Sequence, residues 1–293
     1  MSTALSDTAA APEAADSAAA PAAHIDRLAL IGAGKMGDAL LTALLAAGTV
    51  PAAGVIATAT RQTRLDAVAR RHAGVRTSRD NRVAVRDARI VLLCVKPQIV
   101  PRVLAELADD LTPDHLLIST VAGVTTADLE RPLHHDVPVV RTMPNTPSRI
   151  ASGMTAVCGG RWATGAQIDL ARTLFAGVGR CVVLDEQHFD AVTGLSGSGP
   201  AFIYMVIEAL AEGGVKAGLP RTVATELAAQ TCFGAARMVL ETGHHPALLK
   251  DEVTTPGGCT IDGILTLEEG GLRVTLIKAI VEASRRAREL GDG

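Results

Sequence analysis

One short segment limits the possible folds of this chain more than any other. The apolar residues Leu28–Ile31 run directly into Gly32-Ala33-Gly34-Lys35-Met36-Gly37, and a second apolar stretch follows and ends at Gly48. This order predicts a buried strand, a tight glycine turn and a helix that stops at a glycine. A chain built from such units is expected to form an α/β domain.

Apolar strands continue to alternate with helices up to about residue 184. The helices are predicted at 38–47, 64–72 and 99–108, and the later strands at 55–57, 90–95, 116–119 and 137–141. Strands that are apolar throughout are typical of a parallel sheet covered by helices on both faces. Because crossovers between parallel strands are right-handed, this part is predicted to be a doubly wound, Rossmann-type domain with a mostly parallel sheet.

The pattern changes after Cys181–Leu184. Helices punctuated by Gly or Pro are predicted at 200–218, 221–242, 246–253, 260–268 and 272–290. Small residues along 221–242 favour close helix packing, as in an all-helical domain or an interleaved dimer core. We therefore expect an Ala-rich disordered tail at 1–23, a nucleotide-binding domain at 24–186 and an all-helical domain at 187–293.

Composition and charge exclude several classes of function. The 293 residues carry a formal charge of −3, and only 2% of them are aromatic, so neither a nucleic-acid interface nor a base-stacking platform is predicted. No apolar run approaches the roughly 18 residues of a membrane span, and residues 1–23 lack the regions of a secretory signal. We expect a soluble, cytoplasmic protein without nucleic-acid or membrane partners.

The cysteines and histidines form no recognisable metal or disulfide pattern. The five cysteines are scattered without a C-x-x-C pair, and the eight histidines include the adjacent pairs His134-His135 and His244-His245. Adjacent residues on a helix or strand point in different directions, and no H-E-x-x-H motif accompanies them. The sequence therefore predicts no metal site and no disulfide framework.

The first glycine loop has the context of a dinucleotide-binding fingerprint. Gly32 would permit the turn, Gly34 would let a pyrophosphate approach the backbone, and Gly37 would let the helix pack on the strand. A P-loop is excluded, because Asp38 stands where that motif requires Lys. A packing turn without a ligand is the alternative interpretation.

The end of the second predicted strand distinguishes the possible cofactors. A site for NAD usually places Asp or Glu there, to bind the ribose hydroxyls. This chain has Thr58-Ala59-Thr60-Arg61 instead, two hydroxyls and a cation without an acid. The segment suits a 2′-phosphate, so NADP(H) is the expected cofactor and NAD(H) the second choice. Arg61 as an ordinary solvated charge is the alternative.

A second glycine loop, Thr254–Thr260, stands immediately before a predicted helix. Two glycines and several hydroxyls ahead of a helix N-terminus can form an anion site from backbone amides. The loop is far in sequence from the first one, and a small carboxylate substrate is the natural ligand. A plain N-cap with a flexible turn is the alternative.

Together these segments resemble the pyrroline-5-carboxylate reductase family over 25–290. The markers besides the glycine loop are Val95–Gln98 and three more specific segments: Arg141–Pro147 (RTMPNTP), Leu195–Ala201 (LSGSGPA), and Leu248–Glu268 around Pro256–Thr260 (PGGCT). The resemblance implies NAD(P)H-dependent reduction of 1-pyrroline-5-carboxylate to L-proline, the last step of proline biosynthesis. It also implies that the helical domain forms an interlocked homodimer, with larger rings of dimers in some members.

The resemblance further implies which residues form the site. The cofactor would contact Gly32, Ala33, Gly34, Lys35, Met36, Gly37, Ala59, Arg61, Asn81, Cys94, Val95, Lys96, Pro97, Thr120, Val121 and Ala122. The substrate would contact Asn145, Glu186, Thr255, Gly257, Gly258, Cys259 and Thr260. The partner subunit can supply the loop that carries the last five of these residues. The loop amides would hold the carboxylate, and the Thr260 hydroxyl, as the catalytic group, would face the ring nitrogen. Cys259 stands where the family often has Thr or Ala.

The residues also fit imine chemistry in their own right. Hydride addition to a C=N bond needs a nicotinamide face, a fixed imine and electrophilic activation. A cyclic imine can carry its own proton, whereas a ketone or alcohol would require a placed Lys or His, which the second glycine loop lacks. The alternatives are a non-catalytic NADP-binding sensor, a β-hydroxyacid-dehydrogenase-like enzyme, and a related reductase acting on another imine.

Two polar residues near the markers have competing interpretations. Ser198, two residues before Pro200, is expected to be a helix N-cap rather than a nucleophile. Asn145 is either a turn former or a polar group that faces the nicotinamide, and the resemblance favours the second.

Overall fold

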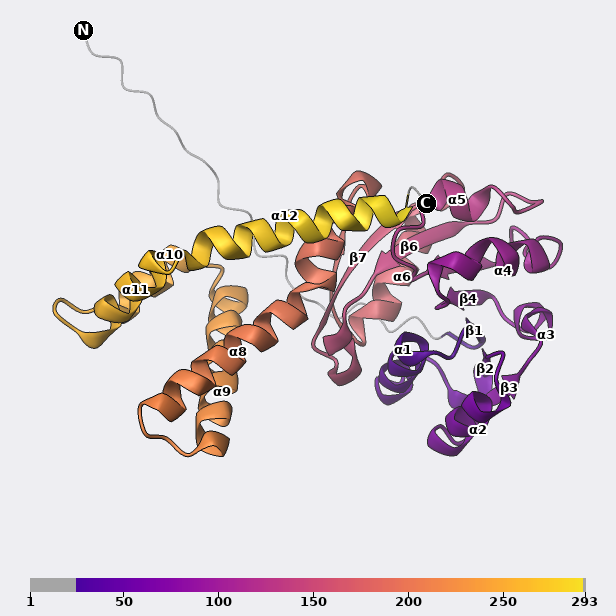
Figure 1. Cartoon of the computed structure of the whole chain (residues 1–293). Coiled ribbons are helices and arrows are strands. Elements are labelled where there is room, and N and C mark those ends of the chain that lie inside the picture. The colour runs from indigo at the N-terminus through magenta and orange to yellow at the C-terminus, as the bar shows by residue number, and fades with distance from the viewer. Residues whose placement is uncertain (1–24, 292–293) are drawn as a thin grey trace, which may run out of the picture.

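The computed structural model describes residues 25–291, so the predicted tail at 1–23 lies outside the described residues. The chain forms a sheet domain covered by helices and a long helical arm that extends from it (Figure 1). The last helix of the arm runs back to the sheet domain, where Glu289 lines a cleft with Pro101 and Asp128.

One eight-stranded sheet forms the centre of the first domain, in the order β3-β2-β1-β4-β5-β6-β7-β8. All neighbouring strands are parallel except β6 and β7, which are antiparallel. The predicted mostly parallel, doubly wound fold is thus confirmed. The strands are β1 (Leu28–Ile31), β2 (Val55–Thr58), β3 (Arg76–Ser78), β4 (Ile90–Leu93), β5 (Leu116–Ser119), β6 (Val139–Met143), β7 (Gly153–Gly159) and β8 (Gly179–Val183).

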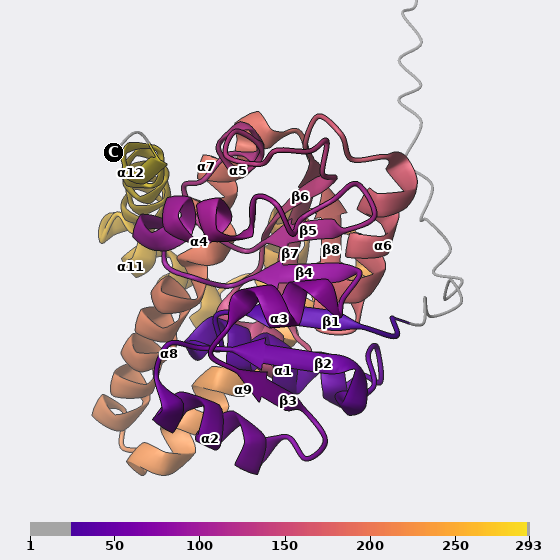
Figure 2. The same cartoon turned by 90° about the vertical axis from the view of Figure 1, so that its right-hand side faces the viewer.

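Helices cover both faces of this sheet (Figure 2). The helices are α1 (Lys35–Ala46), α2 (Gln62–Arg71), α3 (Asn81–Arg86), α4 (Val100–Leu107), α5 (Thr126–Glu130) and α6 (Gly165–Ala176). Short 3-10 turns are η1 (Ala52–Gly54), η2 (Pro97–Ile99), η3 (Thr146–Ile150) and η4 (Glu186–His188). Alternate residues of β1 point to opposite faces. Leu28 and Leu30 join a core with α1, α2 and α6, and Ala29 and Ile31 join one with α3, α4 and α5.

Several predicted boundaries in this domain were wrong. The strand predicted at 90–95 ends at Leu93, because Cys94 and Val95 turn away to border the glycine loop. The strand predicted at 137–141 runs from Val139 to Met143. β3 was not predicted, since it is a three-residue edge strand without an apolar side chain. β7, α3, α5 and α6 were also missed.

The arm is all-helical in the described residues, as predicted. Its elements are α7 (Phe189–Val192), the π turn η5 (Thr193–Gly197), α8 (Gly199–Lys216), α9 (Arg221–Thr242), α10 (Pro246–Val253), α11 (Cys259–Glu269) and α12 (Leu272–Gly291). Ser198 is the N-cap position of α8 with Pro200 in the first turn, as predicted, but the side-chain cap is absent. Ser198 is itself helical, with φ −86° and ψ −27°, and its side chain caps nothing. The helix has already begun at Phe189 and passes through the π turn.

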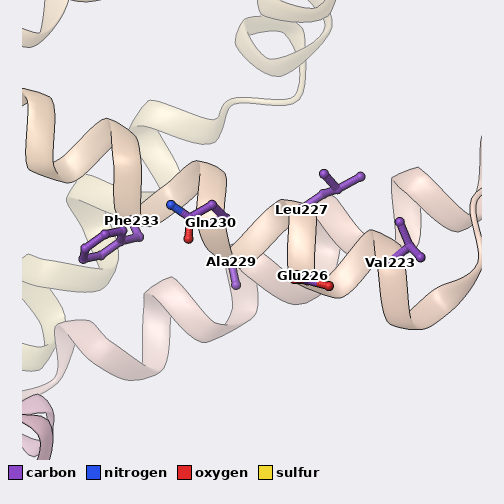
Figure 3. Close-up of a pocket in the computed structure, with 6 residues that line it drawn as sticks. All are labelled: Val223, Glu226, Leu227, Ala229, Gln230 and Phe233. Carbon is purple, nitrogen blue, oxygen red and sulfur yellow. The ribbon is translucent and has the colours of Figure 1, made fainter.

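The arm buries few of its apolar side chains within one chain. Its small core consists of Ala211, Ala224 and Ala228, and a Cβ at Gly214 would lie 3.1 Å from the Ala224 Cβ. On α9, Leu227 and Phe233 are 52% and 55% exposed and project from the helix (Figure 3). One stretch of the described chain, 186–216, is apolar and long enough to cross a membrane by length and composition alone. Exposed apolar helices of this kind require a covering partner.

Candidate active site

The first glycine loop lies at the carboxyl end of β1, near the middle of the sheet. Gly32 has a φ of 97°, and a Cβ there would lie 2.8 Å from the carbonyl oxygen of Cys94. A Cβ at Gly37 would lie 2.4 Å from the carbonyl oxygen of Gly32. At Gly34, however, no atom lies within 4 Å of the Cβ position. Packing therefore requires glycine at positions 32 and 37, whereas Gly34 leaves an open approach to the backbone.

The N-terminus of α1 faces this open space without a side-chain cap. Its N-cap is Gly34, and no side chain accepts a hydrogen bond from its first-turn amides. Arg64 of α2 supports the loop, because its Nε donates to the carbonyl oxygen of Ala33 at 2.7 Å. Free amides at the positive end of a helix dipole form an anion site. The local geometry is that of a phosphate-binding turn.

A cleft of about 750 Å³ opens over this loop. Most of the predicted cofactor residues line the cleft, namely Gly32, Ala33, Gly34, Lys35, Met36, Ala59, Arg61, Asn81, Cys94, Val95 and Lys96. Gly37 and Val121 are buried beside it, and Ala122 lies outside its lining. Thr120 lies behind Cys94 and donates to its Sγ at 3.3 Å, whereas Pro97 lines a neighbouring cleft with Val124.

The carboxyl ends of β2 and β3 form a cationic wall of the cleft. The parallel register places Thr58 opposite Ser78, so Arg79 follows directly beside the turn that carries Arg61. No Asp or Glu is among the residues that line the cleft. Within residues 25–291, the side chains of Arg61 and Arg79 make no ion pair or hydrogen bond. Unpaired cations without a carboxylate favour a phosphate ligand over ribose hydroxyls.

Sequence reasoning missed Arg64, Arg79 and Arg102, which also line the cleft. Arg79 follows β3, which has no apolar residue by which a strand could be predicted. Arg64 and Arg102 lie in helices, and nothing in the sequence distinguishes them from solvent-exposed cations. Only the pairing of β3 with β2 could have placed Arg79 at this edge of the sheet.

Asn81 faces the cleft with both ends of its amide occupied. Its Oδ1 accepts a hydrogen bond from Thr58 Oγ1 at 2.7 Å, and its Nδ2 donates to Glu106 Oε2 at 3.2 Å. Thr58 is buried. These bonds hold the amide in a fixed position, so Asn81 supports the wall on which a cofactor would rest.

The second glycine loop repeats the arrangement of the first. Gly257 has a φ of 69°, and the Gly258 amide donates to the Thr255 carbonyl oxygen at 3.0 Å. Gly258 is the N-cap of α11, and no side chain caps the helix. In the described part of the chain the Thr260 hydroxyl makes no hydrogen bond. The loop thus offers free amides and a free hydroxyl to a small anion.

The two glycine loops do not meet in one chain. The first lies in the sheet domain beside α1, whereas the second lies between α10 and α11 at the outer end of the arm (Figure 1). No residue of the second loop lines the cleft over the first loop. A site that uses both loops therefore needs a second copy of the chain.

Glu186, predicted to contact substrate, is engaged at the base of the arm. Its Oε1 accepts from the Thr126 amide at 2.7 Å and from Arg141 Nη1 at 3.0 Å, and its Oε2 accepts from Thr126 Oγ1 at 2.7 Å. Arg141 is only 4% exposed and lies 4.7 Å from the centre of the Phe189 ring. The substrate contact of Glu186 stays a prediction, and this geometry favours a role in joining the domains.

Asn145, also predicted to contact substrate, lies in the connection after β6. Its amide bonds to Ser196 of η5 and to the amide of Met154. Neither Asn145 nor Glu186 lines the nucleotide cleft. Within one chain, Asn145 and Glu186 therefore do not form a common site with either glycine loop.

The cysteines differ sharply in their surroundings. Burial raises the pKa of Cys94 to about 12 despite the Thr120 hydrogen bond, and it likewise raises the pKa of Cys158 to about 12 and that of Cys181 to about 11. Cys259 is exposed. Among residues 25–291 no three His, Cys, Asp or Glu side chains converge in a way that could hold a metal ion.

These environments predict selective alkylation. A thiol with a raised pKa stays protonated, and only the thiolate reacts. At mildly alkaline pH we expect iodoacetamide to modify Cys259 while leaving Cys94 and Cys158 unmodified in the native protein. Peptide mass spectrometry after timed quenching measures this, and denatured protein, in which all cysteines react, is the control. Modification of Cys94 at the rate of Cys259 would contradict the raised pKa of the Cys94 thiol.

The fold and the glycine-loop cleft together define a dinucleotide-binding domain joined to a helical second domain. The profile of the family described as NADP oxidoreductase, coenzyme F420-dependent, matches residues 27–123. The profile described as pyrroline-5-carboxylate reductase dimerisation matches residues 186–290.

Comparison of the whole chain identifies the family. A pyrroline-5-carboxylate reductase from Methanosarcina acetivorans is 44% identical over 265 residues, 90% of this chain and 98% of that protein. The structure of a pyrroline-5-carboxylate reductase from Coxiella burnetii is similar, with a TM-score of 0.83 and 37% identity over 90% of this chain and 98% of that one. The Plasmodium falciparum enzyme, solved with NADP bound, has a TM-score of 0.81 and 28% identity over 90% and 98%. The chain belongs to the pyrroline-5-carboxylate reductase family.

This membership confirms the resemblance seen in the sequence and makes the protein an NAD(P)H-dependent oxidoreductase. It also indicates that the protein binds a pyridine nucleotide. The dimerisation profile spans the arm whose apolar side chains are exposed in the single chain, which indicates an oligomer.

Proposed function

We propose that the protein reduces 1-pyrroline-5-carboxylate to L-proline, the last step of proline biosynthesis. The observation that carries this proposal is the match to a named reductase over 98% of that protein's length. It includes both glycine loops, each of which ends at a helix N-terminus without a side-chain cap. A non-catalytic sensor would not need the second loop intact.

In the proposed reaction this chain's residues bind and orient the two reactants. When bound, the reduced nicotinamide supplies the hydride. The cleft residues around Cys94–Lys96 would hold the nucleotide, and the free amides before α11 would hold the substrate carboxylate. The Thr260 hydroxyl would lie at the ring nitrogen, where it can stabilise the protonated imine and the product amine. Positioning and electrostatics of this kind can supply about 7–11 kcal/mol.

We further propose that NADPH is the preferred cofactor and that Arg79 acts beside Arg61. The support is the cationic wall at the ends of β2 and β3, which holds two unpaired guanidinium groups and no carboxylate. Both groups can bind the 2′-phosphate that distinguishes NADPH from NADH.

The proposed active unit is a homodimer in which each arm carries the Thr255–Thr260 loop to the partner's nucleotide cleft. The separation of the loops in one chain and the exposed apolar side chains of the arm support it. Larger rings of dimers, as the resemblance implies, stay a prediction that light scattering can test. A cytoplasmic location also stays a prediction, which cell fractionation would test.

The proposed dimer predicts that an Asp substitution has different effects at two exposed apolar positions. Phe233 of α9 is 55% exposed and Val83 of α3 is 51% exposed in the single chain. Phe233→Asp is expected to dissociate the dimer, because each buried large apolar side chain contributes roughly 1.5–3 kcal/mol and the change occurs twice. Val83→Asp, the matched control, should leave the mass unchanged. Light scattering after gel filtration measures both, and an unchanged mass for Phe233→Asp would contradict this interface.

The assay that tests the function follows the absorbance of the reduced nicotinamide with purified protein and 1-pyrroline-5-carboxylate. Imine-dependent loss of absorbance, faster with NADPH than with NADH, is the expected result. Binding of NADPH without any loss would contradict the proposed reaction and favour the sensor. Loss with a different cyclic imine alone would favour the related reductase.

A further inference from the structure

The long helix of the arm contains a local defect at its base. Over η5 the backbone forms a π turn, in which the Ser198 amide donates to the Thr193 carbonyl oxygen at 2.9 Å. Four residues after Ser196 comes Pro200, which has no N–H group. The carbonyl oxygen of Ser196 therefore lacks the donor that an α-helix would supply from position 200.

The missing donor comes from Asn145, on the connection that follows β6. Its Nδ2 donates to the Ser196 carbonyl oxygen at 3.2 Å and lies 3.3 Å from Ser196 Oγ. Its Oδ1 accepts from the Met154 amide, the second residue of β7, at 2.9 Å. The amide thus links the start of β7 to the π turn through both of its ends.

The opposite side of the π turn carries α12. Gly194 is buried, and a Cβ there would lie 2.2 Å from Ser284 Oγ and 2.8 Å from the Ser284 amide nitrogen. The carbonyl oxygen of Ile280 would be 2.9 Å away. The backbone of α12 therefore rests directly on Gly194, and an ion pair of 3.3 Å between Arg288 and Asp190 adds to this contact.

The position of α12 determines where the second glycine loop is held. α11, which begins at Cys259, leads into α12 through Gly270 and Gly271. α12 then runs along the arm and back to the sheet domain (Figures 1 and 2). A change in how α12 sits on the π turn would be carried along this helix to the outer end of the arm, where Thr260 lies.

We propose that Asn145 is a positioning residue that holds the π turn η5 as the seat of α12 and thereby sets the position of the Thr255–Thr260 loop. Nδ2 faces Ser196 and Oδ1 accepts from the Met154 amide, so the amide keeps only one acceptor lone pair for a direct contact with the substrate. This inference rests on the proposed function only for its kinetic readout.

The test compares Asn145→Asp with the wild type in two measurements. Aspartate keeps an acceptor for the Met154 amide but cannot donate to the Ser196 carbonyl oxygen. We expect hydrogen exchange of amides in η5 and α12 to become about tenfold faster, the equivalent of one lost hydrogen bond. The KM for 1-pyrroline-5-carboxylate should rise about tenfold, while NADPH affinity and exchange in β1 and α1 stay unchanged.

Ser196→Ala is the control, since it keeps the carbonyl acceptor, and its KM should stay within about twofold of the wild type. A raised KM for Asn145→Asp with unchanged exchange in α12 would overturn the inference in favour of direct substrate contact. Equal losses of NADPH affinity and substrate affinity would overturn it in favour of a general loss of folding. If the wild type has no reductase activity, the exchange measurement still decides whether Asn145 holds the π turn.

Discussion

Replacing Thr260 by alanine is expected to lower kcat for the imine about a hundredfold, because a hydrogen bond to a charged group contributes about 1.5–3 kcal/mol. The hydroxyl makes no hydrogen bond in the described chain, so its removal leaves no buried partner unsatisfied. It lies in the first turn of α11, far from the nucleotide cleft of the same chain (Figure 1). In the proposed dimer the Thr260 hydroxyl faces the imine rather than the nucleotide, so the Kd for NADPH should stay nearly unchanged.

Steady-state kinetics and NADPH fluorescence titration measure these two effects. Thr260→Ser should restore most of the turnover, because it returns the hydroxyl. Thr266→Ala is the matched control on the same helix, since its hydroxyl donates to the Asp262 carbonyl oxygen at 3.1 Å, away from the loop. A parallel loss of kcat and NADPH affinity in Thr260→Ala would show that the loop is structural.

The double change Arg61→Ala and Arg79→Ala is expected to lower kcat/KM for NADPH about a hundredfold and to leave the value for NADH nearly unchanged. Each charge-assisted hydrogen bond to a phosphate contributes about 1.5–3 kcal/mol, and NADH lacks the 2′-phosphate that would receive it. Each single variant should show about a tenfold loss.

Arg70→Ala is the control for this pair, because Arg70 is an exposed cation on α2 outside the cleft lining. Parallel titrations with adenosine 2′,5′-bisphosphate and with 5′-AMP test the phosphate contact without catalysis. An unchanged NADPH-to-NADH ratio in the double variant would remove both arginines from the cofactor site. A loss in Arg61→Ala alone would remove Arg79.

The two glycine loops show how much of the site the chain reveals before folding. Gly32, Gly34 and Gly37 stand between an apolar strand and a helix, and the structure gives them the close contacts and the open backbone that this spacing requires. Such motifs are local, because a few consecutive residues determine whether the turn and the free helix N-terminus can form. The mostly parallel sheet followed from the same local patterns.

Local patterns could not predict the tertiary partners of Asn145, Glu186 and Arg79. The resemblance implied that the first two contact the substrate. In the structure the Asn145 amide donates to the Ser196 carbonyl oxygen, which Pro200 leaves without a donor, 51 residues along the chain. Glu186 meets Thr126 and Arg141 across similar separations. Such partners follow from tertiary packing rather than from neighbouring residues.

The sequence by itself determined the two glycine turns, the class of fold and the family, because each depends on short motifs and strand or helix periodicity. Only the tertiary structure decided which cations meet at the nucleotide cleft, since Arg79 comes to Arg61 through the pairing of the three-residue strand β3. Only the structure showed the π turn and the outward position of the second loop. These features depend on contacts between distant segments, and hydrophobic periodicity carries no information about such contacts.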